Sequence, residues 1–487
     1  MPVTLEVIIG LEVHAQMSTR TKMFCGCDND AFGKEPNTTV CPICMGHPGT
    51  LPVPNGEAVQ KAIRTSLALG CTVNGDSHFD RKHYFYPDLP SGFQISQYDF
   101  PLANHGTITY DILDAGGAKV AEKTCRIHRL HMENDAGKLT HVGSRTLCDY
   151  NRAGTPLMEI VTEPDLRSAD EAVAFAQELR RVLVAIQASE ADMFKGMMRF
   201  DASISLREKG TEKLNPRSEI KNLNSFKSLE RALLYEEKRL RNLWEEQSGP
   251  LKGNITVGWM DDEEKTRVLR EKEDAQDYRY FPEPDIPPLH FEAAFIEEVK
   301  KKLPVLPRAQ REKYVALGLP EAKALQLMDD PLLRSHFDAV LERTKDVKKA
   351  SGIVLTQLIG FLKEQGKTLD QGPSKDAILE LVDAIESGTI SGNAGKDVLE
   401  KMITTGKGAK EIIAAEGMQQ ISDDSSLQTL VDRAIAENQK AVESYKAGKQ
   451  AALGAVMAWV MKETKGQANP AKVNEMLRKL LETPDEN

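Results

Sequence analysis

Four cysteines near the N-terminus have the residue type and spacing of a metal site. Cys25 and Cys27 form a C-x-C pair, and Cys41 and Cys44 form a C-x-x-C pair after thirteen intervening residues. Each pair can occupy one edge of the tetrahedron that Zn²⁺ prefers. Four unrelated buried thiols are the alternative, and a disulfide is less favoured. Because four thiolates leave no open coordination position, we expect a structural Zn²⁺ that holds a loop in place.

Carboxylates and imidazoles suggest a second, different metal site. Glu12 and His14 lie in residues 5–16 (LEVIIGLEVHAQ), whose β-branched and apolar side chains predict a strand. Alternate residues of a strand share a face, so these two side chains should point the same way. His131 and Glu133 repeat the arrangement in residues 129–138. Oxygen ligands with one imidazole suit Mg²⁺ or Mn²⁺ better than Zn²⁺. An ion pair at a strand edge is the alternative interpretation.

The elements that must position these residues change in character near residue 290. Before it, turns rich in Gly, Pro and Asn alternate with short strand-like runs, and helices are predicted at 168–187 and 229–246. This mixture predicts an α+β fold with a large, antiparallel sheet. Beyond residue 290 the chain is predicted to be almost wholly helical, most clearly at 427–447 and 449–465.

Length and composition limit the class of protein. The 487 residues predict two to four domains. The net charge of -10 argues against a general nucleic-acid coat protein, although it is compatible with a local basic groove. No stretch approaches about eighteen consecutive apolar residues, so no membrane span is expected. Seven cysteines, an odd number, and no leader before the first predicted strand indicate a reduced, cytoplasmic protein.

Longer segments resemble one family. Residues 7–15 (VIIGLEVHA), 81–98 (RKHYFYPDLPSGFQISQY), 149–167 (DYNRAGTPLMEIVTEPDLR), 219–227 (EIKNLNSFK) and 277–289 (DYRYFPEPDIPPL) are similar, in this order, to the B subunit of glutamyl/aspartyl-tRNA amidotransferase, GatB. Residues 448–474 resemble the tail that this family shares with YqeY-like proteins. The resemblance implies a mixed or antiparallel-sheet cradle domain over 1–292, an all-α helical domain over 293–405 and an α-helical tail over 406–487.

The resemblance also implies a reaction. GatB works in a heterotrimer with the amidase subunit GatA and the small subunit GatC. It would bind tRNA carrying the wrong amino acid, Glu on tRNA-Gln or Asp on tRNA-Asn, and phosphorylate the side-chain carboxylate with ATP. Ammonia released from glutamine by GatA would then displace phosphate. The protein's own task is to position two anions and neutralise their charge, which suits a bound Mg²⁺.

Residue roles follow from the same resemblance. It implies Mg²⁺ ligation by Glu12, His14, Glu133 and Glu159, and catalytic roles for Glu133, Lys82 and Arg152, with Arg152 as a phosphate ligand. It assigns the four cysteines to the zinc-bearing subset of the family. The lysines of the tail, Lys449, Lys462 and Lys465, would bind tRNA, although solvated helix faces explain most lysines in most proteins.

Two positions depart from the family pattern. The family commonly has Lys at the position of Ser91 and Glu at that of Asn134, and these charges face each other near the exit of the ammonia channel. We hypothesise that Ser91 and Asn134 are neighbours that form a neutral, polar gate. The departures leave one rival function open, a tRNA-binding scaffold subunit with a weakened kinase site, although Glu12, His14 and Glu133 are intact. A second rival is an ATP-dependent carboxylate–amine ligase that does not use tRNA, which the lysines of the tail disfavour. The sequence does not decide which misacylated tRNA is the natural substrate.

Overall fold

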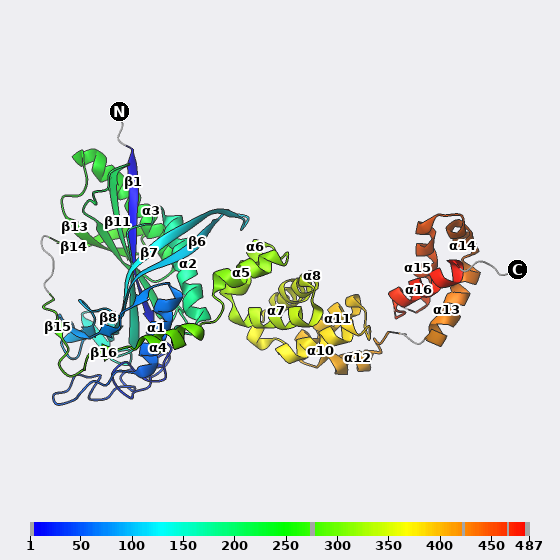
Figure 1. The fold of residues 1–487 in the computed structure, drawn as a ribbon, viewed down its shortest axis with the longest axis horizontal. Helices are drawn as coiled ribbons and strands as arrows, with labels where there is room; N and C mark the ends of the chain where they lie inside the picture. Colours follow the sequence, from blue (N-terminus) through cyan, green and yellow to red (C-terminus); the bar gives the residue numbers. More distant parts are fainter. Residues whose placement is uncertain (1–3, 273–277, 421–423, 465–466, 483–487) are drawn as a thin grey trace. The chain divides into compact units, whose positions relative to one another are not determined.

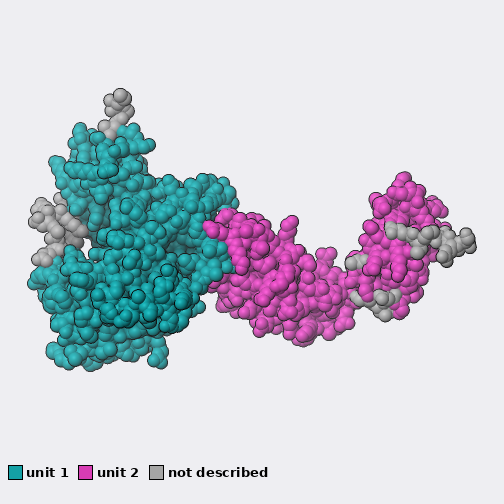
Figure 2. Space-filling model, in the orientation of Figure 1, with its two compact units in different colours: residues 1–310 teal, residues 311–487 magenta. Residues whose placement is uncertain are grey.

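The computed structural model describes residues 4–272, 278–420, 424–464 and 467–482. The chain divides into two compact units, residues 1–310 and residues 311–487 (Figure 2). All the described strands belong to the first unit, and the second is helical (Figure 1). This agrees with the predicted α+β class.

A nine-stranded sheet forms the framework of the first unit (Figure 1). The pair β12–β13 is parallel and the other pairs are antiparallel, so the sheet is mixed. The predicted strand over residues 5–16 is confirmed as β1, at the centre of the sheet. The strand order is β14 (Lys265–Lys272), β13 (Asn254–Met260), β12 (Ser218–Leu223), β11 (Met198–Glu208), β1 (Leu5–Gln16), β10 (Pro156–Thr162), β7 (Lys119–Asn134), β6 (Ala103–Leu113) and β2 (Thr72–Val73).

The two faces of this sheet differ because β1 alternates. Its odd-numbered residues, such as Leu11 and Val13, are buried in one core with the apolar sides of α1 (Gly56–Ala68), α2 (Ala169–Ala185) and α3 (Phe226–Gln247). The predicted helices at 168–187 and 229–246 correspond to α2 and α3. The even-numbered residues Glu12 and His14 lie on the opposite face and border a cavity.

Three small sheets and one helix complete this unit. The small sheets are β15 (Phe281–Pro282) with β4 (Asp80–His83) and β5 (Phe93–Ser96), β16 (Leu289–His290) with β3 (Asp76–Ser77), and β8 (Lys138–Val142) with β9 (Arg145–Asp149). Helix α4 (Ala293–Lys301) follows, and its Val299 is buried in the hydrophobic core of this unit, against which Leu303 and Leu306 also pack. The unit therefore continues to Gln310, beyond the domain edge expected at residue 292, because apolar residues after that point need the same core.

Helices make up the second unit, around two separate hydrophobic cores. The first of these cores includes Ile412 and Ile413 of α12, so the helices around it extend past the boundary expected at residue 405. Its helices are α5 (Pro307–Ala316), α6 (Glu321–Asp329), α7 (Pro331–Thr344), α8 (Val347–Ala350), the π-helix η1 (Ser351–Leu358), α9 (Ile359–Glu364), the 3₁₀ turn η2 (Leu369–Gln371), α10 (Lys375–Glu386), α11 (Gly392–Thr405) and α12 (Ala409–Glu416).

The C-terminal core is built by the last helices. It includes Leu427, Val456, Val460 and Leu477. The single helix predicted over 427–447 is two helices, separated at Asn438. The elements are α13 (Asp424–Glu437), α14 (Gln439–Lys446), η3 (Gln450–Ala452), α15 (Leu453–Glu463) and α16 (Pro470–Glu482). In the part of the chain that the structure describes, no helix has both the length and the apolar character needed to cross a membrane.

Candidate functional site

Cross-strand pairing brings the predicted ligands together on the face opposite the helices. His14 of β1 lies opposite Glu159 of β10 and opposite Arg199 of β11. Glu159 in turn lies opposite His131 of β7. Residues directly opposite each other in antiparallel strands point to the same side of the sheet, so these side chains form one row across four strands. Glu133 follows His131 by two residues and shares its face.

His14, Glu133 and Glu159 form the first of two ligand clusters, and they have the donor set of a divalent-cation site. One ligand atom from each of His14, Glu133 and Glu159 lies within 4.8 Å of the other two. His14 Nε2 is 3.4 Å from Glu159 Oε2, and His131 Nε2 is 3.3 Å from the same oxygen. The hydroxyl of Ser96 donates to Glu133 Oε2 at 3.2 Å. Two carboxylates and one imidazole fit Mg²⁺ or Mn²⁺.

The charged side chains of this cluster shift one another's pKa values. Burial alone would raise the pKa of Glu159, but the imidazoles of His131 and His14 hold it well below its usual range. Burial lowers the pKa of His131, yet the charges of Glu159 and Glu133 outweigh it and raise that pKa to about 9. His131 Nδ1 is buried and has no hydrogen-bond partner among the described residues. Glu159 is therefore held in its carboxylate form, which is the form that binds cations.

A second cluster lies beside the first and contains Glu12. One atom from each of Glu12, Asp201 and Glu219 lies within 4.8 Å of the others. Asp201 is directly opposite Glu12 in the pairing of β1 with β11. Lys221 Nζ is 2.8 Å from Asp201 Oδ2 and 2.9 Å from Glu219 Oε1. The structure thus separates Glu12 from the other three expected Mg²⁺ ligands and groups it with two carboxylates to which sequence reasoning gave no role.

Negative charge accumulates around Glu12. Burial raises the pKa of Glu12, and the carboxylates of Glu159, Asp201 and Glu219 raise it further. Because the charge of Glu159, in the first cluster, raises the pKa of Glu12, in the second, the two clusters interact electrostatically. Two adjacent clusters of possible cation ligands are an arrangement that suits phosphoryl transfer, where charge on both reactants must be neutralised.

Lys82 faces these clusters across a cavity of about 620 Å³. Its ammonium lies 5.0 Å from the ring centre of Tyr278 and 5.7 Å from that of Tyr84. Burial lowers the pKa of Lys82, but the charge of Glu133 and other nearby groups outweighs it, so the side chain stays protonated. The two aromatic residues that follow Tyr84 in the chain, Phe85 and Tyr86, are mostly exposed and do not border this cavity. The cavity is also bordered by Tyr98, Arg129, His131, Arg217, Arg279 and Tyr280.

Comparison with known proteins identifies the family. The family model described as GatB/GatE catalytic domain matches residues 7–297, and that described as GatB domain matches residues 335–481. The chain belongs to the GatB family. The B subunit of the aspartyl/glutamyl-tRNA(Asn/Gln) amidotransferase of Myxococcus xanthus is 45% identical over 99% of this chain and 100% of its own length. The proteins of the same name from Persephonella marina and Thermotoga maritima are 46% and 42% identical, each over 98% of this chain and over 99% and 98% of their own lengths.

Arg152 of this GatB-family chain has a different environment. Its guanidinium donates to the carbonyl oxygens of Ala136 at 2.9 Å and Gly137 at 2.6 Å, and it lies 3.7 Å from a carboxylate oxygen of Asp135. Asp135 also accepts from Arg199 at 3.0 Å. These bonds compete with the expected phosphate contact, and they support a role for Arg152 in fixing the loop after β7.

The four cysteines of the predicted zinc site come together. Their sulfur atoms lie within 4.8 Å of one another, and all seven cysteines are free thiols. Lys22 is fully buried, with Nζ 3.7 Å from Cys44 Sγ. Hydrogen bonding from Cys25, with a contribution from the Lys22 charge, lowers the pKa of Cys44 to about 5. A thiolate beside a buried ammonium fits a closed tetrathiolate site for Zn²⁺.

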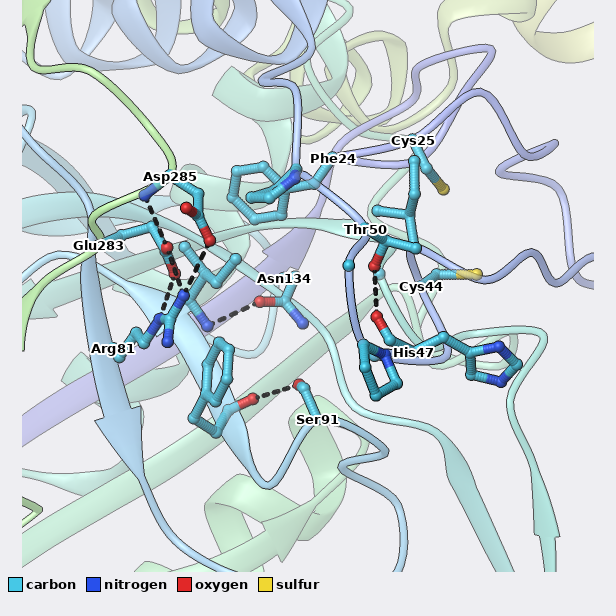
Figure 3. A pocket seen from close by; sticks show the side chains of 18 residues that line it. Phe24, Cys25, Cys44, His47, Thr50, Arg81, Ser91, Asn134, Glu283 and Asp285 are labelled. Atoms are coloured by element: carbon cyan, nitrogen blue, oxygen red, sulfur yellow. Dashed lines mark hydrogen bonds and ion pairs between the residues drawn. The ribbon is translucent and has the colours of Figure 1, made fainter.

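Ser91 and Asn134 border one cavity beside this cysteine loop (Figure 3). The cavity measures about 330 Å³ and lies between residues of the loop, including Cys44, and the ion pair of Arg81 with Glu283. Ser91 Oγ donates to the carbonyl oxygen of Phe93 at 2.9 Å, and Asn134 Oδ1 accepts from Ile95 N at 2.9 Å. Both polar side chains are therefore held by β5, on the wall of the same cavity.

The structure describes two of the three tail lysines that were predicted to bind tRNA. Lys449 and Lys462 are exposed, which a role in binding polyanions requires. Lys465 lies outside the described residues. Trp459 packs at the edge of the C-terminal core, and the Arg433 guanidinium carbon lies 5.5 Å from the centre of its ring.

Proposed function

We propose that this chain is the tRNA-dependent kinase and transamidation subunit of an aspartyl/glutamyl-tRNA amidotransferase. The observation that carries the proposal is a pair of adjacent ligand clusters, one formed by His14, Glu133 and Glu159 and the other by Glu12, Asp201 and Glu219. All of these residues except Glu133 border one cavity together with Lys82. The names of the relatives supply the substrate class. In this proposal, the complex acts in the cytoplasm.

The chain's own residues have distinct roles in this proposal. The first cluster would hold one divalent cation and the second cluster another. Bound Mg²⁺ would neutralise charge on the phosphates of ATP and on the substrate carboxylate, which allows the two anions to approach. Lys82 would donate to an anionic oxygen from the opposite wall of the cavity. His131 would hold Glu159 in place through the contact described above.

The proposed reaction has two steps. A side-chain carboxylate oxygen of Glu or Asp on tRNA attacks the γ-phosphorus of ATP, the bond from that phosphorus to the bridging oxygen breaks, and ADP leaves. The product is an acyl phosphate. Ammonia then attacks the acyl carbon, the carbon–oxygen bond to phosphate breaks, and one proton is lost as the amide forms. Phosphorylation is needed because a carboxylate has no usable leaving group.

Ammonia would come from the amidase subunit GatA in a complex that also contains GatC. We propose that the cavity bordered by Ser91 and Asn134 is a neutral, polar part of its path. The four cysteines would bind a structural Zn²⁺ that stabilises one wall of this cavity, since Cys25 and Cys44 contribute to it. Lys449, Lys462 and Lys465 would contact phosphates of the tRNA.

The test uses the purified heterotrimer. ATP cleavage and amide formation are measured with Glu-tRNA-Gln and with Asp-tRNA-Asn, for the wild type and for Glu133→Ala. We expect Glu133→Ala to lower ATP cleavage by about 100-fold or more, because it removes a buried charge that stabilises the transition state through the cation. Glutaminase activity and tRNA binding should persist, which would show that the complex is intact.

Two results would contradict the proposal. If Glu133→Ala cleaved ATP at the wild-type rate, the kinase chemistry would lie elsewhere. If amide formation by the wild type did not require tRNA, the substrate class would be wrong and a ligase acting on free carboxylates would replace it.

A further inference from the structure

The loop between the two cysteine pairs contacts a segment that is distant in the chain. This inter-cysteine loop, residues 28–40, has one pair of candidate metal ligands at each end. Six hydrogen bonds join it to residues 148–151, at the end of β9, and the bonded residues are 111 to 116 positions apart in the chain. The reaction as described above gives this contact no role.

Asn37 makes three of these bonds from the loop. Its backbone N donates to Asp149 Oδ1 at 3.0 Å, and its side-chain Nδ2 donates to the carbonyl oxygen of Cys148 at 3.2 Å. Its Oδ1 accepts from Tyr150 N at 2.8 Å. Asn37 has a φ of 61°, in the left-handed region that asparagine tolerates better than most residues. An asparagine therefore suits both the backbone conformation and the partners at this position.

Asn151 makes the other three bonds from the segment. Its side-chain Oδ1 accepts from Thr39 N at 2.8 Å, and its Nδ2 donates to the carbonyl oxygen of Glu35 at 2.7 Å. Its backbone carbonyl oxygen accepts from Thr39 Oγ1 at 3.4 Å. The Asn151 residue is almost completely buried. Removing its amide would therefore leave backbone groups of the loop without their partner, which is costly where water has no access.

A second contact joins the cysteines themselves to the same segment. The Nζ of Lys22, which is fully buried, lies 3.7 Å from Cys44 Sγ and 3.4 Å from the carbonyl oxygen of Tyr150. The backbone N of Lys22 donates to the carbonyl oxygen of Cys27 at 3.0 Å. One lysine thus contacts a cysteine of each pair and the segment. Ordering of the four cysteines would therefore order this contact as well.

The segment leads directly to the first ligand cluster. Arg152 follows it, and its guanidinium holds the carbonyl oxygens of the two residues after Asp135, close behind Glu133 in the chain. Asp135 accepts from Arg199, which lies opposite His14 in the pairing of β1 with β11. The chain then enters β10, the strand that carries the third ligand. Displacement of the segment would therefore be felt at all three ligands.

We propose that Asn151 is a positioning residue through which closure of the inter-cysteine loop by Zn²⁺ strengthens cation binding by His14, Glu133 and Glu159. The inference rests on the proposed Zn²⁺ and Mg²⁺ sites. All of residues 28–40 are described and none is buried, so the loop has no hydrophobic core of its own. Its order depends on its hydrogen bonds and on its two ends, which Zn²⁺ would hold together.

Asn151→Leu tests this inference on the full-length chain, because leucine has the same branched shape without the amide. Two quantities are measured with Zn²⁺ bound and after its removal by chelation and dialysis. They are amide hydrogen exchange over residues 148–155 and the Kd for Mn²⁺, followed by electron paramagnetic resonance. In the wild type, removing Zn²⁺ should speed exchange about tenfold and raise the Kd for Mn²⁺ about tenfold. In Asn151→Leu, both should match the zinc-free wild type whether or not Zn²⁺ is bound.

Two further variants complete the experiment. Thr38→Val is the matched control, since the Thr38 hydroxyl donates to the carbonyl oxygen of Glu35 within the loop, and it should behave like the wild type. If Asn151→Leu does not fold, Asn37→Gly replaces it. Glycine keeps the positive φ and removes the two side-chain bonds to the segment, so zinc dependence should be lost in the same way.

The possible outcomes separate this inference from the proposed function. Exchange and Mn²⁺ affinity that do not depend on Zn²⁺ in the wild type overturn the coupling and leave both metal sites standing. Zinc dependence that persists in Asn151→Leu also overturns it, because the coupling would then use another route. A wild-type chain that binds no Zn²⁺, or no Mn²⁺, overturns the corresponding site of the proposed function and the inference with it.

Discussion

One buried side chain outside the first ligand cluster contacts both of its carboxylates. His131 is almost completely buried, and its Nε2 lies 3.3 Å from Glu159 and 3.8 Å from Glu133. It links the two carboxylates without being in the first ligand cluster itself. Groups in this position orient metal ligands, and their loss commonly weakens metal binding by about 10- to 100-fold.

We therefore expect His131→Phe to weaken Mn²⁺ binding by about 10- to 100-fold. Phenylalanine keeps the ring volume but leaves Glu133 and Glu159 without this partner. Mn²⁺ titration followed by electron paramagnetic resonance measures the effect. His128→Phe is the control, because His128 is on the same strand but exposed, and is paired with Glu163. Equal Mn²⁺ affinity of the two variants would show that His131 does not organise the site.

The Ser91 and Asn134 pair provides a second test at the scale of residues. Asn134→Glu places a carboxylate on a cavity wall where the cation of Arg81 is already paired with Glu283 and Asp285, whereas Ser91→Lys in the same chain supplies a second cation. We expect Asn134→Glu to reduce the amide formed per glutamine hydrolysed by roughly tenfold, which corresponds to about 1.4 kcal/mol of unfavourable charge interaction. The double variant Asn134→Glu with Ser91→Lys should recover most of the lost amide yield. A double variant no better than Asn134→Glu would mean that the two positions do not act together.

At the scale of elements, strand alternation was predictable and strand pairing was not. The pattern in residues 5–16 correctly predicted β1 and the common face of Glu12 and His14. The grouping of Glu12 with Asp201 and Glu219 depends on the register of β11 and β12, whose carboxylates lie 189 and 207 residues after Glu12 in the chain. Nothing local in a sequence specifies such a register. Alternation within residues 198–207, with Asp201 among small and apolar residues, is the only signal that could have suggested this carboxylate.

The edge of the first unit also depends on contacts that the local sequence does not specify. The composition changes near residue 290, but the first unit continues to residue 310 because Val299, Leu303 and Leu306 pack against the sheet domain. A helical pattern shows that a segment is amphipathic. It does not show which core its apolar side covers.

The segment 278–290 contributes to one wall of the cavity that Lys82 borders. Its Tyr278 and Tyr280 border the cavity, and Glu283 anchors it through two hydrogen bonds of 2.7 Å from Arg81. The Glu283 side chain is fully buried. Arg81 also lies over the Phe93 ring, with the guanidinium carbon 4.4 Å from the ring centre. This ion pair therefore ties the segment to β4 and β5.

Glu283→Gln should loosen this segment. Losing a buried charge-assisted pair costs about 2 kcal/mol, which corresponds to roughly thirtyfold faster amide hydrogen exchange over residues 278–290. The KM for ATP should rise as well, because Lys82 and the tyrosines lose their support. Asp285→Asn is the control: this partner of Arg81 is partly exposed and 3.2 Å away, so its loss should change little. Unchanged exchange in Glu283→Gln would show that the segment is held by other contacts.

At the scale of the whole molecule, separate cores allow the tail to be tested by itself. The C-terminal core contains residues from Leu427 onward, whereas the preceding core closes with α12. Charge on the tail's surface can therefore be changed without disturbing the residues of the sheet that carry the proposed chemistry. Of the three lysines predicted to bind tRNA, Lys449 and Lys462 are described; both are exposed and suit phosphate contacts.

Replacing Lys449 and Lys462 with Gln should weaken tRNA binding in a salt-dependent way. Each phosphate contact contributes about one unit to the slope of log K against log salt, so the double variant should lose about two units. ATP cleavage at saturating tRNA should be unchanged. Lys410→Gln is the control, since Lys410 belongs to α12 and is also exposed. A wild-type slope in the double variant would mean that these lysines are simply solvated, and that the net charge of -10 is offset for tRNA by a basic surface elsewhere in the chain or in its partner subunits.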